Sequence, residues 1–450
     1  MKEIKTFLFL LIFALIQNGL NANNEDTVEL SLVQAQNYAL EHSLTVKDAK
    51  LDASIAKRRI AETRAIGLPQ VNASAGYQYN FEIPTSLVPA EFFGGPPGEF
   101  AEIQFGTEQN LSANLNVNQL IFDGSYFIGL KAAKIYRDIA NKNIAKSEIE
   151  IKTSVAQTYF LALITSENIN ILEQNIANME KTNQETQKLF EAGFTDHINK
   201  EQIKLAVSRL KNMLSNLERQ KTVTHNLLKF QIGMKLEEKI HLTDDLNELI
   251  NNIKLETLNN EQFNPTNHID YQVVLAWESM QEMNLKREKS AFYPSLSGNY
   301  VYQQSAMRNE FNFLDTDESW FPASFFGINL NVPIFSSGMR RSKVQQAKLE
   351  LDKARLATYQ TEQSVELQFQ EALAEFNSAL EKYQNDKENL ELAERILERT
   401  NIMHKEGLAT SLELTQANDQ VLDTQSEYLR SIFELLNAKN EFDKAMGMQR

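Results

Sequence analysis

The chain has 450 residues, of which 42% are hydrophobic, with only 16 glycines and 9 prolines. This composition favours long helices over a compact sandwich of short strands, and a formal net charge of −15 argues against a nucleic-acid partner. The chain has no cysteine, which excludes disulfides, thiolate metal sites, cysteine nucleophiles and a lipid-attachment cysteine.

The amino terminus predicts export. Lys2 and Lys5 precede an apolar run over residues 7–16, and small or polar residues continue to Ala22. This pattern is typical of a signal peptide over residues 1–22, cleaved after Ala22. The run is too short for a membrane anchor, and no later segment approaches 18 consecutive apolar residues. If the protein crosses a membrane, we expect it to do so without helices.

A first repeat is predicted over residues 23–232. A short helix over residues 30–64 begins at a capping box formed by Ser31 and Gln34. Apolar and small polar residues then alternate over residues 71–83 and 111–121, separated by a Pro- and Gly-rich loop over 84–106. The alternation predicts a β-hairpin over residues 70–122, with strands of membrane-spanning length and one apolar face.

A helical hairpin completes this repeat. A long helix is predicted over residues 125–191, a tight turn at Gly193, and a return helix over residues 195–232. Residues 233–265 are polar and acidic with several turn signals, and we interpret them as an equatorial mixed segment.

The second repeat is predicted over residues 266–450. It has a short helix ending near residue 291, a β-hairpin over 294–335, a long helix over 337–406 and a return helix over 411–446. Its first strand has a weaker alternation than that of the first repeat, and a loop is predicted over 305–321. The turn at Gly407 is a near copy of the turn at Gly193, so the chain is two versions of one plan.

Four strands cannot close a barrel, and open strand edges in lipid leave backbone groups unpaired. The barrel is therefore expected to be shared between chains. Eight strands would come from a dimer, twelve from a trimer and sixteen from a tetramer, and the sequence does not choose among them.

The whole mature chain resembles the outer membrane efflux protein family, the TolC-like channels. The resemblance rests on the order of several short motifs: residues 30–35, Leu68-Pro69 and Tyr293-Pro294 before the strands, residues 122–124 and their echo at 335–338, and the two glycine turns. It implies a mainly α fold with a transmembrane β part, in which duplicated helical hairpins form a periplasmic α-barrel. It also implies a homotrimer with a shared 12-stranded outer-membrane β-barrel.

The resemblance further implies a passive exit duct of a tripartite efflux system, with a periplasmic adaptor and an inner-membrane pump of the RND or ABC type as partners. The residues that correspond to adaptor-docking positions at the two turns are Gly193, Phe194, Thr195, Gly407, Leu408, Ala409 and Thr410.

The tunnel-mouth candidates are Glu413, Gln416 and Asn199. The family places a further acid at the position of Gln416, and Asn199 occupies the first-repeat position equivalent to Glu413, so this mouth is less acidic than the family pattern. The alternative for Glu413 is an ordinary solvated glutamate of a helix surface.

Catalysis and cofactor binding are not predicted. The six histidines lack metal-ligand spacing, and no nucleotide-binding or nucleophile motif occurs. His197 and His404 lie beside the two turns, which raises the hypothesis of pH-sensitive docking. Trp320, Phe321 and nearby aromatics form either an interfacial girdle or ordinary loop packing. The alternative functions are the outer-membrane component of type I protein secretion and a structural coiled-coil protein of the envelope.

Overall fold

The computed structural model describes residues 27–253 and 263–448 and divides into two compact units, each drawn from both repeats. Among the described residues, unit 1 comprises 27–51, 142–253, 263–272 and 360–448, and unit 2 comprises 52–141 and 273–359. The predicted signal peptide and part of the equatorial segment lie outside the described residues.

Unit 1 is built on helical hairpins. It contains α2 (Leu32–His42), α5 (His197–Ile232), α6 (Leu246–Asn251) and α10 (Ser411–Ala445), with parts of the long helices α4 (Gly124–Glu191) and α9 (Met339–Lys405). The strands β1 (Val28–Leu30) and β6 (Ile240–Leu242) pair in parallel, and the 3₁₀ turn η3 covers Pro265–Asn267. The equatorial segment therefore has a strand and a short helix where it is described.

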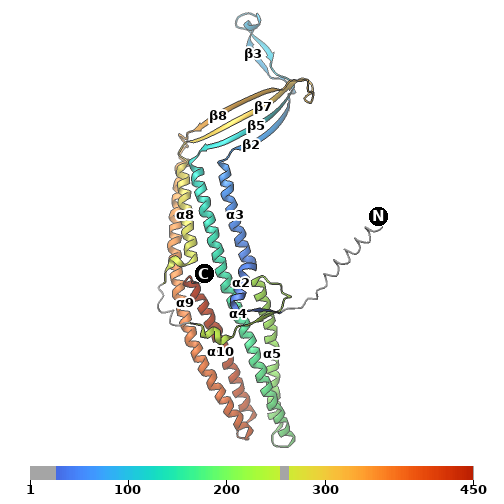
Figure 1. Ribbon diagram of the computed structural model, residues 1–450, viewed down its shortest axis with the longest axis vertical. Coiled ribbons are helices and arrows are strands. Elements are labelled where there is room, and N and C mark those ends of the chain that lie inside the picture. The colour runs from blue at the N-terminus through green and yellow to red at the C-terminus, as the bar shows by residue number, and fades with distance from the viewer. Residues whose placement is uncertain (1–26, 254–262, 449–450) are drawn as a thin grey trace, which may run out of the picture. The chain divides into compact units, whose positions relative to one another are not determined.

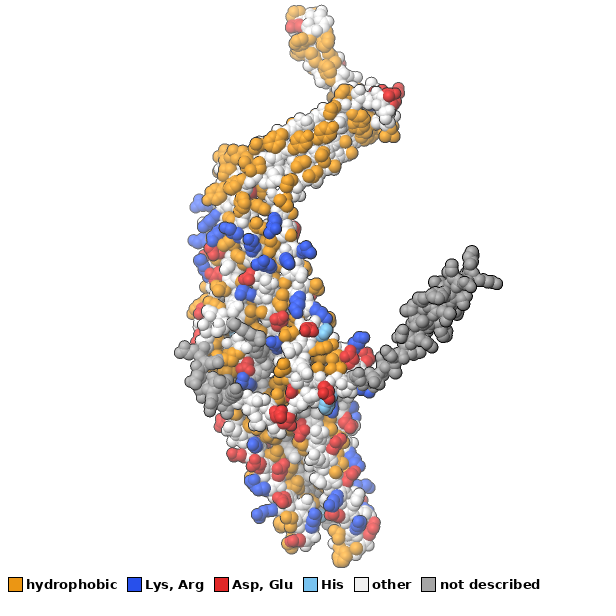
Figure 2. Space-filling model, in the orientation of Figure 1, with side chains coloured by type: hydrophobic (Ala, Val, Ile, Leu, Met, Phe, Trp, Pro, Cys, Tyr) orange, Lys and Arg blue, Asp and Glu red, His pale blue; other side chains and the backbone are white. Residues whose placement is uncertain are grey.

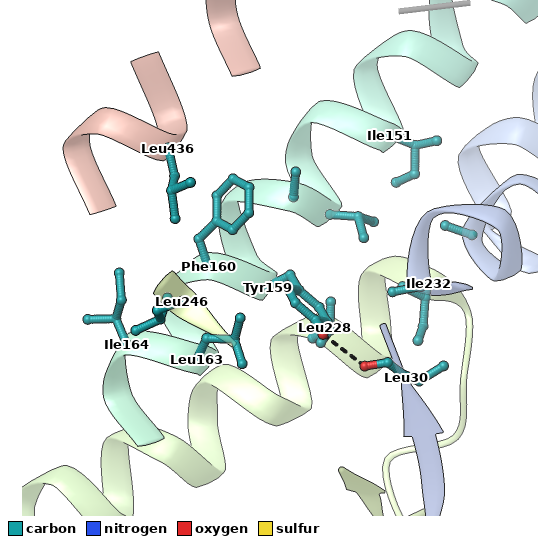
Figure 3. Close-up of a cluster of buried hydrophobic side chains, with 14 of the residues drawn as sticks. Leu30, Ile151, Tyr159, Phe160, Leu163, Ile164, Leu228, Ile232, Leu246 and Leu436 are labelled. Carbon is teal, nitrogen blue, oxygen red and sulfur yellow. Dashed lines mark hydrogen bonds between the residues drawn. The ribbon is translucent and has the colours of Figure 1, made fainter. Parts of the chain in front are cut away.

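The core of unit 1 brings α2, α4, α5 and α10 together around Tyr159, which is fully buried (Figure 3). The Tyr159 hydroxyl donates a hydrogen bond of 2.8 Å to the carbonyl oxygen of Leu30 at the end of β1. This bond joins β1 to the middle of the long helix α4. A second cluster, toward the turns, packs residues of α4 and α5 against Leu414 of α10.

Unit 2 holds a four-stranded antiparallel sheet in the order β2-β5-β7-β8 (Figure 1). Its strands are β2 (Gln70–Tyr79), β5 (Gln109–Phe122), β7 (Ser295–Arg308) and β8 (Phe321–Asn331). The helices α3 (Leu44–Ile66) and α8 (Ile269–Ser290) precede β2 and β7, while α4 and α9 follow β5 and β8. Because neighbouring strands are antiparallel, all four helices join the same end of the sheet, and the two connecting segments lie at the other end.

The predicted short helix over residues 30–64 is wrong as one helix. It is divided into α2 and α3, because Ser43 has an extended ψ of 136° and ends α2. Packing explains the break: the turn at Gly233 lies directly on the backbone of His42 and Ser43, so close that a Cβ on Gly233 would overlap the His42 carbonyl group. That contact joins residues far apart in the sequence, so the residues around Ser43 do not predict it.

The strand predictions also need correction. The predicted loop over residues 84–106 contains a small hairpin of β3 (Thr85–Pro89) and β4 (Phe100–Gln104), joined through the 3₁₀ turn η2 (Ala90–Phe93). The first strand ends at Tyr79 and not near residue 83, and beyond it the Asn80 amide still donates to the Glu108 carbonyl (2.7 Å). The first strand of the second repeat is not weak: β7 has 14 residues against 10 for β2, and it reaches into the predicted loop as far as Arg308.

Candidate functional site

The turn at Gly193 ends α4 with a left-handed residue. Gly193 has φ of 78°, its amide donates to the Phe190 carbonyl (3.0 Å), and the Phe194 amide donates to the Leu189 carbonyl (2.8 Å). These two bonds form a Schellman motif, which satisfies carbonyl groups at the helix end. No atom lies within 4 Å of a Cβ built on Gly193. The glycine is therefore required by its backbone angle and not by crowding.

The turn at Gly407 repeats this geometry at the end of α9. Gly407 has φ of 72°, its amide donates to the His404 carbonyl (3.0 Å), and the Leu408 amide donates to the Met403 carbonyl (2.8 Å). The two glycines that the sequence singles out thus occupy equivalent backbone positions.

The helices that follow the turns begin at equivalent residues with different caps. Asp196 caps α5 by accepting a hydrogen bond of 2.8 Å from the Asn199 amide. Thr410 caps α10 through a complete capping box with Glu413. The return helix predicted from residue 195 therefore begins at His197, because the cap is Asp196.

Both turns expose apolar side chains at matching positions. Phe194 and Leu408 directly follow the glycines and are 82% and 68% exposed, and Ile198 and Leu412, in the first turn of the next helix, are also exposed. Burying such side chains is favourable, so an exposed apolar pair at each turn is a feature of contact surfaces. Ile198 and Leu412 were not among the predicted docking residues, although they occupy matching positions in the two copies of the turn.

Glu413, a tunnel-mouth candidate, has a defined local role. Its carboxylate accepts hydrogen bonds from the Thr410 amide (2.7 Å) and the Thr410 hydroxyl (3.0 Å). The backbone bond, followed by the side-chain bond, lowers the pKa of Glu413 below its usual value, so the exposed carboxylate is ionised at neutral pH. Of the other candidates, Gln416 is exposed in the second turn of α10, and Asn199 is half-buried in the first turn of α5.

The two hairpins contact each other near the turns. Arg209 of α5 and Asp419 of α10 form an ion pair of 3.1 Å, and Leu414 is buried against α4 and α5. His404 lies in this region with its Nε2 3.2 Å from the Ser411 hydroxyl. Burial lowers the pKa of His404, and the charge of Glu185 opposes this shift only in part. His404 is therefore largely neutral at neutral pH, whereas His197 is exposed, 3.9 Å from Glu201.

The sheet of unit 2 has two chemically different faces. The register pairs Val71 with Val117 and Val117 with Tyr300, and Tyr300 with Phe326, so these apolar residues share one face. The opposite face carries mostly small residues and amides. One row across it consists of Asn72, Asn116 and Val301 with Phe325, and the next of Ser74, Asn114, Gln303 and Ala323.

Across residues 27–253 and 263–448, no helix combines the length and the apolar character needed to cross a membrane. The same residues contain no cluster of three or more histidines and acids able to hold a metal ion.

Residues 36–234 and 279–448 match the family model described as outer membrane efflux protein. The chain belongs to this family. An outer membrane efflux protein is a channel of the outer membrane. The present chain therefore lies in the outer membrane, with its helical part in the periplasm.

Individual proteins that are similar to this chain are also outer-membrane proteins or channels. The Outer membrane protein TolC of Vibrio cholerae is 22% identical over 335 residues, which cover 71% of this chain and 68% of that protein. The structure of CusC superposes with a TM-score of 0.74 at 15% identity, covering 93% of this chain and 92% of CusC. The Campylobacter jejuni CmeC outer membrane channel gives 0.70 at 17% identity, covering 93% and 86%. CusC and CmeC therefore share the fold of this chain, which combines long helices with a β-sheet.

Proposed function

We propose that the chain is one protomer of a trimeric exit duct, whose three sheets join edge to edge into a 12-stranded barrel. The observation that carries the proposal is the sheet of unit 2, with β2 and β8 at its edges and one apolar face. An edge strand exposed to lipid would leave a row of backbone groups unpaired, so the edges require partner strands. Strands β8 and β2 of neighbouring copies supply them.

The apolar face then meets lipid and the amide-rich face lines the duct. Amides and hydroxyls can bond to water and to solutes of either charge, and no side chain of the polar rows described above is ionisable. Such a lining gives a wide aqueous path with little charge selectivity. The duct itself is passive, and the energy for transport comes from a pump in the inner membrane.

The two turns are proposed to dock a periplasmic adaptor. The docking residues are Gly193, Phe194, Thr195, Gly407, Leu408, Ala409 and Thr410, with Ile198 and Leu412 added from their exposure. In each turn the Schellman motif fixes the glycine, and the residue after it is held outward as an apolar anchor. Apolar anchors of this kind dominate the energy of protein contacts.

Docking is tested by replacing Phe194 and Leu408 together by Ser. We expect the double variant to insert and form trimers but to lose co-purification with its adaptor and to lose export. The control is Leu392→Ser, which removes a half-exposed apolar side chain from α9 away from the turn. Normal co-purification of the double variant, or an equal loss in the control, would contradict the docking assignment.

Glu413 is proposed to contribute a ring of three carboxylates at the tunnel mouth, together with Gln416 and Asn199. Its lowered pKa keeps each carboxylate ionised, so the ring attracts cations. Glu413→Gln keeps a side chain able to complete the capping box but removes the charge. A reduced cation preference in reversal-potential measurements supports the mouth assignment, and an unchanged value supports a purely capping role.

Drug efflux and type I protein secretion use the same kind of duct, and the pump sets the substrate. The two are separated by co-purification of native complexes: an RND-type pump supports efflux, and an ABC exporter with a bound polypeptide supports secretion. A structural coiled-coil role would be indicated by a protein that forms envelope contacts but no ion path.

A further inference from the structure

The helix-side end of the sheet carries a concentration of cations that is unusual for this acidic chain. Arg64 and Lys289 lie in the last turns of α3 and α8, and Arg340 and Arg341 lie in the first turn of α9. Figure 2 shows Lys and Arg side chains gathered over the helices beside the apolar strands. We call the following residues the basic collar: Arg64, Lys131, Lys289, Arg340, Arg341 and Lys343.

Helix stability does not account for the whole collar. Cations at the ends of α3 and α8 complement the helix dipole, but cations at the start of α9 oppose it. The first turn of α9 contains no acidic residue to offset Arg340 and Arg341. Sequence features that disfavour their own element are often retained for function.

Ion pairing does not account for it either. In the described ranges, no carboxylate lies within 4.0 Å of a collar nitrogen, while the neighbouring acids Glu282 and Glu288 already pair with Lys286 and Arg287. Arg340 is held locally: its guanidinium donates to the Pro333 carbonyl (3.0 Å) and lies 5.6 Å from the centre of the Phe292 ring. The other collar side chains are exposed and available to an external anion.

Apolar side chains lie between the collar and the strands. Ile334 and Phe335 are 92% and 83% exposed in the link from β8 to α9, and Leu68 and Tyr293 are exposed in the links that lead into β2 and β7. Exposed aliphatic and aromatic groups followed by Lys and Arg are the arrangement expected where hydrocarbon gives way to lipid headgroups.

The other end of the sheet has the opposite charge. The connecting segment over residues 80–108 contains five glutamates and no Lys or Arg. A basic end and an acidic end on one lipid-length sheet give the two membrane surfaces different electrostatic partners.

We propose that the basic collar binds the anionic phospholipid headgroups of the membrane leaflet on the helix side of the sheet. The proposal rests on the proposed function, which places the sheet across the outer membrane. The long Lys and Arg stems lie along the apolar links while their charged ends contact lipid phosphates. The collar thereby fixes the depth of the sheet in the membrane.

The test uses the full chain reconstituted into phosphatidylethanolamine vesicles that contain a minor fraction of phosphatidylglycerol. Electron spin resonance of trace spin-labelled lipids measures which lipid is immobilised at the protein surface. The collar variant carries Arg64→Gln, Lys131→Gln, Lys289→Gln, Arg341→Gln and Lys343→Gln, and leaves the packed Arg340 unchanged.

The control variant removes the same number of charges from exposed positions of unit 1: Lys181→Gln, Lys188→Gln, Lys204→Gln, Arg395→Gln and Arg399→Gln. We expect the wild type and the control to prefer phosphatidylglycerol, and the collar variant to lose about fivefold or more of that preference. The wild-type preference should also fall in high salt. Exchanging Arg and Lys at the collar sites should retain it, which separates loss of charge from loss of folding.

Equal lipid preference in the wild type and the collar variant would overturn the proposal. A collar variant that keeps its lipid preference but changes the ion selectivity of the duct would also overturn it, because the collar would then face the lumen. The proposed function fails separately: it is contradicted if the wild type does not insert or does not conduct.

Discussion

Gly407→Ala should open the turn between α9 and α10 more often without any steric clash. Gly407 has φ of 72°, and a Cβ built there has no neighbour within 4 Å. The whole cost therefore comes from forcing an L-residue into the left-handed region, about 1–2 kcal/mol. The population of the opened turn should rise by a factor of about 5–30.

Hydrogen exchange measured by mass spectrometry provides the assay. The Leu408 amide is protected by its 2.8 Å bond to the Met403 carbonyl, so peptides covering this turn should lose protection by that factor. Gly193→Ala should act in the same way at the end of α4. Gly129→Ala is the matched control, since Gly129 lies inside α4 with open space around it, and Ala stabilises such a position by about 0.5–1 kcal/mol. Unchanged or greater protection in Gly407→Ala would refute the reasoning.

Three further predictions concern packing and charge. Tyr159→Phe should lower the free energy of unfolding by about 0.5–1.5 kcal/mol in urea titration, because it removes a buried hydrogen bond to the Leu30 carbonyl, which keeps the Thr243 amide (3.1 Å) as its other donor. Gly233→Ala should lower the melting temperature and the yield of folded protein, because its Cβ would overlap the His42 carbonyl group at φ of 78°. Glu413 has a lowered pKa, so its stabilisation of α10 is present above the unfolded-state pKa and is lost as the pH falls through the folded-state pKa. Hydrogen-exchange protection at the start of α10 should therefore decrease as Glu413 is protonated. Glu413→Gln should remove this pH dependence.

These predictions have internal controls. Tyr38→Phe removes a hydroxyl that makes no hydrogen bond within the part of the chain that the structure describes, so it should leave stability nearly unchanged. A Tyr38→Phe effect as large as that of Tyr159→Phe would show that the loss of a tyrosine hydroxyl, and not of the bond to Leu30, lowers the stability. A pH dependence that persists in Glu413→Gln would assign the titration to another group.

The sequence predicted those elements of the fold that depend on residues close together in the chain. The alternation from Val71 onward predicted the strands, and an isolated glycine before a capping residue predicted both turns. The break at Ser43 was not predictable in this way, because the capping box at Ser31 and the apolar spacing beyond it continue a helical pattern. The break coincides with the contact between Gly233 and the backbone of His42 and Ser43, which joins residues far apart in the sequence.

The candidate site shows the same division. Gly193 and Gly407 were identifiable because only glycine adopts their backbone angles readily. The exposure of Ile198 and Leu412 depends on which helix face α4 and α9 cover, and the sequence leaves that open. The hairpin of β3 and β4 was missed because its short strands lie among Pro, Gly and Glu residues that are typical of loops.

Planar-bilayer recording of the purified full chain tests the central claim most directly. We predict insertion as a trimer with stepwise ion conductance. A protein that inserts as an oligomer but opens no ion path would contradict the proposed duct.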